Sequence, residues 1–140
     1  MAYLFDTDAI SELFRPRPLP GYVAWLRRVS REDQFTSAVV VGELFEGAFL
    51  SGSTRHLENL ERRVLPTVIV LPYDAGVARV FGRIGAVLRA RNHRLADADL
   101  QIAATALHHG LELVTGNVRH FKRVPELKVG RALADARGEG

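Results

Sequence analysis

The chain has 140 residues, a length that supports one globular domain with a substantial core. Its hydrophobic fraction of 47% and charged fraction of 25% exclude a wholly disordered protein, and the absence of cysteine excludes disulfides and thiolate metal sites. The net charge of +3 and the isoelectric point near 9.8 permit binding to phosphate groups without establishing it.

The N-terminal segment predicts one strand and two helices. Residues 2–5, AYLF, form an apolar run that is typical of a buried strand. Residues 6–14 follow as a helix in which Thr7 or Asp8 is placed as the N-cap. The three prolines of RPRPLPG end this helix, and residues 22–29 form a second, amphipathic one.

The middle of the chain continues the alternation. Residues 34–36, QFT, predict a short strand, and Ser37 is placed to cap an apolar helix over residues 38–50. A polar helix over about residues 54–64 leads to residues 67–71, TVIVL, whose β-branched side chains favour a strand.

The last part of the chain predicts two long helices and two strands. Helical periodicity covers residues 74–91, and a second helix over residues 98–110 ends at a glycine. Residues 111–115, LELVT, predict a strand, and residues 127–129 predict a last edge strand. The tail over residues 131–140 lacks a core pattern, so we expect it to fray.

Strands that alternate with helices predict an α/β fold. We expect a three-layer α/β/α domain over residues 1–130, with a central, mainly parallel sheet of four to five strands. The first residues lack the pattern of a secretion signal, and no apolar run approaches the roughly 20 residues that cross a bilayer. We therefore expect a cytoplasmic protein.

Polar side chains collect where the strands are expected to end. In open α/β sheets, sites form outside the carboxyl ends of the strands. Asp6 ends the first strand, Asn117 follows the strand LELVT, and Asp99 begins a helix that a loop could bring to the same edge. These three side chains could therefore converge.

Two of the acids have ordinary structural explanations as well. Asp6 could cap the first helix, although Asp8 already offers a cap and leaves Asp6 free for other work. Glu43 lies in an apolar helix and could be a solvated residue, a role that suits Glu46 better.

Asp97 and Asp99 stand two positions apart at the start of an apolar helix. Such residues point about 200° apart, so both cannot reach one point if both are helical. We expect Asp97 as the N-cap or a loop residue and Asp99 as the acid of the first turn, where the positive helix end stabilises both. That arrangement would explain both acids without any catalysis.

A divalent cation would relieve the repulsion between converging acids. Three or four carboxylates without arginine partners raise one another's pKa values. Oxygen-only ligands suit Mg²⁺ or Mn²⁺ rather than zinc, and the five histidines show no spaced pair of the HExxH kind. Bound Mg²⁺ could activate water and neutralise the charge that develops on a phosphodiester.

Four stretches of the chain together carry a resemblance. They are LFDTDAISEL, VVVGELFEGA, ADADLQIAATALHHGLELVT and GNVRHF. In this order and spacing they resemble the opening strand and helix, the glutamate helix, the third acid with its helix and strand, and the closing motif of PIN-domain nucleases. The likeness is to the VapC-type toxins of bacterial toxin–antitoxin pairs, and it spans almost the whole chain.

The resemblance implies a site at definite positions. Asp6, Glu43 and Asp99 would be the metal-site acids, Glu43 directly or through water, with Asp97 as a neighbouring helper. Asn117 takes the fourth acidic position, where relatives carry Asp or Asn.

Two positions depart from the usual motifs of that family. His120 stands where Asp is common, and Asp8 stands where Asn is usual. These departures weaken the case for a second tightly held metal ion, but they leave the three-acid core.

The resemblance also implies an activity and partners. The chain would be a Mg²⁺-dependent endoribonuclease, with Mn²⁺ able to substitute, that uses a metal-activated water and leaves 3′-hydroxyl and 5′-phosphate ends. It would form a homodimer, be blocked by a VapB-like antitoxin, meet DNA only through that antitoxin and have no membrane partner. Relatives often cleave structured RNA such as tRNA, but nothing in the sequence names the substrate.

Two other functions compete with this one. The DxD pattern of YLFDTDAI also fits haloacid-dehalogenase-like phosphatases, with Asp6 as phosphoryl acceptor and Asp8 as general acid. That class should carry a later lysine and a GDxxxD-like motif, for which VTGNVRHF supplies no acids. The other alternative is a binding module for RNA or a partner whose site has decayed, against which the intact acids argue.

Overall fold

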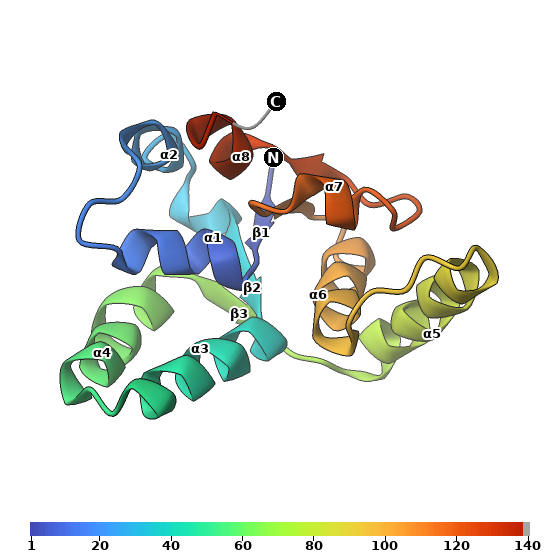
Figure 1. Cartoon of the computed structure of the whole chain (residues 1–140), viewed down its shortest axis with the longest axis horizontal. Coiled ribbons are helices and arrows are strands. Elements are labelled where there is room, and N and C mark those ends of the chain that lie inside the picture. The colour runs from blue at the N-terminus through green and yellow to red at the C-terminus, as the bar shows by residue number, and fades with distance from the viewer. Residues whose placement is uncertain (139–140) are drawn as a thin grey trace.

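A five-stranded sheet runs through the centre of the computed structural model, which describes residues 1–138 (Figure 1). The strands are β1 (Tyr3–Phe5), β2 (Gln34–Ser37), β3 (Ile69–Leu71), β4 (Glu112–Val114) and β5 (Val129–Gly130). They lie in the order β3-β2-β1-β4-β5, and each neighbouring pair is parallel. The predicted parallel sheet is confirmed.

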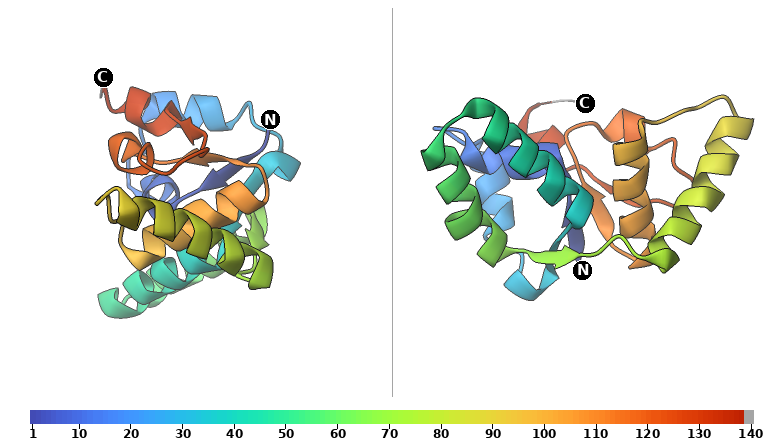
Figure 2. Two further views of the ribbon diagram at one scale, coloured as in Figure 1. Left: turned by 90° about the vertical axis from the view of Figure 1, so that its right-hand side faces the viewer. Right: turned by 90° about the horizontal axis from the view of Figure 1, so that it is seen from below.

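Helices cover both faces of this sheet. The main helices are α1 (Thr7–Ser11), α2 (Pro20–Leu26), α3 (Ala38–Ser51), α4 (Thr54–Asn59), α5 (Ala75–Ala90), α6 (Asp97–His108), α7 (Val118–Phe121) and α8 (Ala132–Ala136). Single turns occur at η1 (Glu12–Phe14), η2 (Arg31–Asp33), η3 (Leu60–Val64) and η4 (Leu65–Thr67). Figures 1 and 2 show α3 and α4 on one side of the sheet and α5 and α6 on the other. None of the helices within residues 1–138 is long and apolar enough to cross a membrane.

The core is centred on β1, β4 and α6. Leu4 and Leu113, which face each other across the two strands, are wholly buried. Helix α6 adds Ile102 and the small buried side chains of residues 103–106, which let the helix lie close to the sheet. Burying a leucine side chain stabilises a fold by roughly 2 kcal/mol, so this packing holds α6, and with it Asp99, firmly in place.

The cap of α1 is not the one assigned to that helix, and it confirms the structural explanation given for Asp6. Asp6, rather than Thr7 or Asp8, is the N-cap, and its carboxylate accepts a hydrogen bond from the Ala9 N–H at 2.8 Å. The helix begins one residue after β1 ends, so Asp6 is the last extended residue. Its side chain can therefore accept a hydrogen bond from an N–H group of the first turn. Asp8 is thereby left for a different contact.

The C-terminal tail was predicted to fray, and for Ala132–Ala136 this prediction is wrong. These residues form α8, in which Leu133 is wholly buried, and α8 lies against α2. Arg137, directly after the helix, forms ion pairs with α1 and η1. Two buried residues and one arginine give too weak a pattern for prediction from the sequence. Residues 139–140 lie outside the described residues.

Candidate active site

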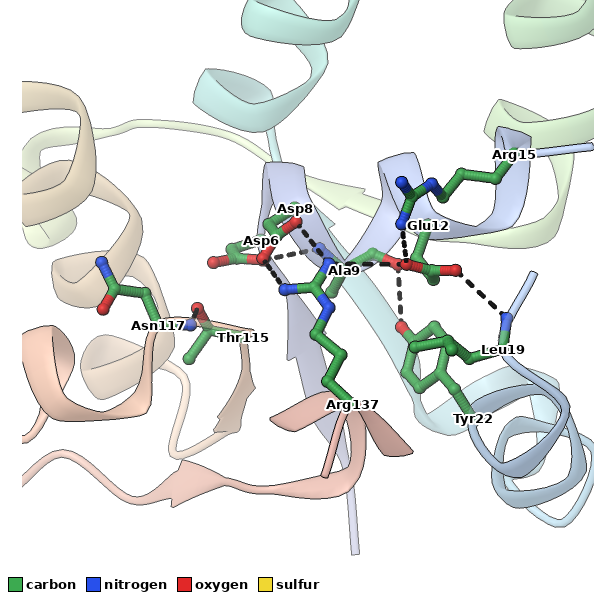
Figure 3. A network of polar contacts seen from close by, with 10 residues as sticks. All are labelled: Asp6, Asp8, Ala9, Glu12, Arg15, Leu19, Tyr22, Thr115, Asn117 and Arg137. Carbon is green, nitrogen blue, oxygen red and sulfur yellow. Dashed lines mark hydrogen bonds and ion pairs between the residues drawn. The ribbon is translucent and has the colours of Figure 1, made fainter. Parts of the chain in front are cut away.

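The segments that follow β1 and β4 meet at one edge of the sheet and line a pocket of about 390 Å³. The lining residues are Asp6, Thr7, Asp8, Ser11, Glu43, Asp99, Ile102, Asn117 and Phe121. We call this the carboxylate pocket. Asp6, Glu43, Asp99 and Asn117, which the sequence selects, all line it, and Figure 3 shows Asp6 beside Thr115 and Asn117.

Asp6 lines this pocket and is almost fully buried. The pKa of its carboxyl is raised to about 7, chiefly by burial, and the negative charges of Asp8 and Asp99 contribute to this rise. Hydrogen bonds from the Thr115 hydroxyl and the Ala9 N–H oppose this rise but do not cancel it. A cation bound nearby would therefore strongly stabilise the ionised form of Asp6.

Glu43 enters the pocket from α3. As predicted, Ser37 caps this helix by accepting a hydrogen bond from the Val40 N–H at 3.1 Å. The Thr7 hydroxyl donates to Glu43 Oε1 at 2.5 Å, and this bond turns Glu43 toward α1. Glu46 is exposed, which fits the solvated role expected for it.

Asp99 enters the pocket from the first turn of α6. Its Oδ2 lies 3.2 Å from Nε2 of His120, a residue of α7. The side chain of Asp99 remains 37% exposed, so it is accessible to a ligand in the pocket.

Asp97 is not brought to this pocket. It is exposed and lines a separate cavity of about 750 Å³ between α5 and α6, together with Arg89 and Arg94. The prediction that Asp97 is the N-cap is wrong, because Ala96 holds the cap position and Asp97 is already helical. Two helical residues at this spacing face different directions, as the geometry of a helix requires.

Sequence reasoning missed several partners of the predicted residues. Thr7 and Thr115 are hydroxyl neighbours of the motifs, and their place beside the predicted acids could have suggested a hydrogen-bonding role. His120 was noted only as a departure from the motif. Arg137 is 129 positions from its partner Asp8, a separation at which the sequence offers no signal.

The carboxylate pocket suits a divalent cation by its donor chemistry. Carboxylate oxygens with one amide oxygen, from Asn117, are what Mg²⁺ and Mn²⁺ bind in proteins. However, within residues 1–138 no group of three or more His, Asp or Glu side chains is arranged to hold a metal ion together. The Thr7 hydroxyl binds Oε1 of Glu43 and His120 lies beside Oδ2 of Asp99, so each carboxylate could use its second oxygen to bind an ion.

Comparison with known sequences finds one family. The family described as "PIN domain" matches residues 3–127. Toxin FitB of Neisseria gonorrhoeae is 37% identical over 124 residues, which cover 84% of this chain and 89% of that protein. VapC ribonuclease Y4jK of Sinorhizobium fredii is 33% identical over 125 residues, which cover 85% of this chain and 89% of that protein.

Solved structures show the same likeness. The crystal structure of FitAcB from Neisseria gonorrhoeae superimposes with a TM-score of 0.83 at 34% identity, covering 91% of this chain and 96% of that one. A toxin-antitoxin complex from Klebsiella pneumoniae contains a chain with a TM-score of 0.66 and 27% identity, covering 90% and 95%.

Proposed function

The chain belongs to the PIN domain family, and from this premise we propose that it is a Mg²⁺-dependent endoribonuclease that acts as the toxin of a toxin–antitoxin pair. The observation that carries the proposal is the carboxylate pocket, where Asp6, Glu43, Asp99 and Asn117 meet at the carboxyl ends of β1 and β4. The names of two relatives, a toxin and a ribonuclease, support it.

A divalent ion in the carboxylate pocket would supply an activated water and neutralise charge on the phosphodiester. Asp6 and Asp99 would bind the ion, and Glu43 would bind it directly or through water. Asn117 would orient a ligand or a water with its amide group. Asp97, outside the pocket, would act only through its charge.

The hydrogen bonds around these acids serve to orient them. The Ala9 N–H and the Thr115 hydroxyl fix the carboxylate of Asp6. Holding acids in position before the ion arrives reduces the cost of organising the site during the reaction.

A cationic pocket of about 340 Å³ adjoins the carboxylate pocket and favours a polynucleotide substrate. Its lining residues are Gly116, Asn117, Val118, Arg119, Lys122, Arg131 and Ala134, so the two pockets share Asn117. Cationic side chains at this position could bind a phosphate next to the one that is cleaved. A substrate with several phosphates would use both pockets, whereas a small phosphomonoester would use one.

The rival assignment as a DxD phosphatase is disfavoured by the contacts of Asp8. Both of its carboxylate oxygens accept hydrogen bonds from Arg137, at 2.8 and 2.9 Å. A carboxylate whose two oxygens are both engaged by a guanidinium group is poorly placed to protonate a leaving group as a general acid.

We propose that an apolar groove between α1, α2 and η3 receives a segment of a VapB-like antitoxin. The groove has a volume of about 580 Å³, and its walls combine apolar side chains such as Ile10, Leu13 and Leu26 with Arg27 and Arg63. An amphipathic segment with apolar anchors and acidic flanks would complement it. We further propose that the toxin is a homodimer and meets DNA only through the antitoxin.

Cleavage of RNA by the purified protein tests the activity. EDTA should abolish cleavage, and added Mg²⁺ or Mn²⁺ should restore it with 3′-hydroxyl and 5′-phosphate ends. The double variant Asp6→Asn/Asp99→Asn, purified in parallel, controls for contaminating nuclease. Cleavage that persists in EDTA, or in this variant, would refute the proposal.

A further inference from the structure

Arg137 lies close to the C-terminal end of the chain and contacts Asp8, a lining residue of the carboxylate pocket (Figure 3). Its Nη1 and Nη2 donate to the two oxygens of Asp8 at 2.8 and 2.9 Å, which makes the pair bidentate. Nη2 also lies 3.4 Å from Oε1 of Glu12, whose side chain is fully buried and accepts a hydrogen bond from the Leu19 N–H. Two parallel bonds between charged groups are among the stronger polar contacts in proteins.

The ion pair also packs against the segment that follows β4. A Cβ atom on Gly116 would overlap both Nη1 of Arg137 and Oδ2 of Asp8, so glycine is the residue that leaves room for the pair. The same segment carries Thr115, which hydrogen-bonds Asp6, and Asn117, which lines the pocket. Arg137 therefore contacts both walls of the pocket, the one from α1 and the one from the β4–α7 segment.

The ion pair between Arg137 and Asp8 lowers the net negative charge of the carboxylate pocket. Four carboxylates line the pocket, and Asp8 is the one whose two oxygens are both bound to a cation of the chain. Without Arg137, Asp8 would add a negative charge beside Asp6 and offer a divalent ion a competing ligand. Arg137 lies beyond residues 3–127, so the part of the chain that matches the family does not supply this cation.

We propose that Arg137 is a positioning residue of the candidate active site. It neutralises Asp8 and occupies both of its oxygens, so that a divalent ion is left to Asp6, Glu43 and Asp99. This inference rests on the proposed metal-dependent activity, but its charge effect can be measured without RNA.

A charge cycle tests this role with Mn²⁺ as the probe. Mn²⁺ affinity is measured by calorimetry, and kcat and KM for RNA cleavage are measured in Mn²⁺, for the wild type, Asp8→Asn, Arg137→Gln and the double variant. Arg137→Gln should bind Mn²⁺ about tenfold more tightly, because it exposes one negative charge, yet its kcat should fall about tenfold at similar KM. Asp8→Asn should bind Mn²⁺ several-fold more weakly, and the double variant should return to within about threefold of the wild type in affinity and kcat.

Two further variants keep the test decisive. Arg83→Gln removes an ion pair with Glu126, neither of which lines the pocket, and should change none of these values. Arg137→Lys retains the charge and should stay within about threefold of the wild type in affinity. If Arg137→Gln fails to fold, as judged by circular dichroism, Arg137→Lys and the double variant carry the comparison.

The outcomes separate neutralisation from a structural link between α8 and α1. A structural link predicts that both single variants and the double variant lose activity equally, with unchanged Mn²⁺ affinity, and that result would overturn the proposal. Wild-type affinity and kcat in Arg137→Gln would overturn it as well. If the wild type binds Mn²⁺ but cleaves no RNA, the proposed function fails, and the order of the Mn²⁺ affinities alone decides on Arg137.

Discussion

The first turn of α6 separates two cavities of opposite character. On one side, Asp99 lines the carboxylate pocket with three other acids. On the other side, Asp97 lines the larger cavity between α5 and α6, where its companions are Arg89 and Arg94. The larger cavity has the poorer claim to be a metal site, since it holds one carboxylate beside two guanidinium groups. The charge of the lining, and not the volume, therefore distinguishes the two.

The comparison also shows that two aspartates in the same turn of a helix can have different surroundings. Asp97 and Asp99 are both first-turn acids of α6, and both gain from the positive end of the helix. Two positions along a helix rotate a side chain by about 200°, which sends one aspartate to each cavity. The same residue type thus meets different partners, and substitutions at the two positions should have very different effects.

The largest effect should come from the acids of the carboxylate pocket. Asp6→Asn and Asp99→Asn should each reduce RNA cleavage on the order of 100-fold or more, because each removes a negative charge that would hold the ion. Initial cleavage rates in Mg²⁺ measure this, and circular dichroism shows whether the fold persists. Full activity in either well-folded variant would contradict the assignment.

The next effect concerns stability and pH at Asp6. Its folded-state pKa of about 7 lies above the ordinary value of 3.8, so the protonated form is favoured in the folded protein. The stability that the protonated carboxyl contributes to the folded protein is fully present below about pH 4 and is lost as the pH rises through 7. Asparagine at position 6 carries no charge and can still cap α1. In EDTA, Asp6→Asn should therefore be more stable than the wild type by about 4 kcal/mol at pH 8, the free-energy equivalent of this rise in pKa.

Urea unfolding at pH 5 and pH 8 checks this prediction. At pH 5 the difference between Asp6→Asn and the wild type should be clearly smaller than at pH 8, because the wild-type carboxyl is then protonated in the folded protein and less of its contribution to stability has been lost. Asp97→Asn, on the exposed side of α6, serves as the matched control and should show no such pH dependence. A gain in stability that is the same at both pH values would show that burial of the charge is not its cause.

A smaller effect should separate the cations beside the two cavities. Arg119→Ala/Lys122→Ala should raise KM for RNA about tenfold with little change in kcat, because these side chains line the pocket next to the carboxylates. Arg89→Ala/Arg94→Ala removes the same charge from the cavity between α5 and α6 and should change KM less than about threefold.

Salt dependence sharpens this comparison. Only the first pair of substitutions should flatten the dependence of KM on salt concentration, since only that pair would remove phosphate contacts. If the pair in the cavity between α5 and α6 has the larger effect, the RNA passes along the other side of α6.

The sequence alone predicts the sheet, the main helices and the edge at which the polar residues meet. Asp6 and Asn117 are placed correctly because each follows a strand, and parallel strands end together. The cap of α1 was assigned to Thr7 or Asp8 because Asp6, Thr7 and Asp8 are all residue types that cap helices, and the sequence does not show which of them is the last extended residue. The role of Arg137 could not be predicted at all, since its partner is distant along the chain and its helix buries few residues.

The smallest effect should come from Asp97. Asp97→Asn removes a charge from the exposed side of α6 and leaves the carboxylate pocket intact. It should lower cleavage by less than about tenfold, through the weaker negative field at the proposed metal site. It should lower stability by about 0.5 kcal/mol, through the loss of an acid from the positive helix end. Cleavage rates and Mn²⁺ titrations on Asp97→Asn and Asp99→Asn, measured side by side, decide the matter. An equal and complete loss in both variants would make Asp97 a direct ligand, and α6 would then have to unwind its first turn to bring both aspartates to one ion.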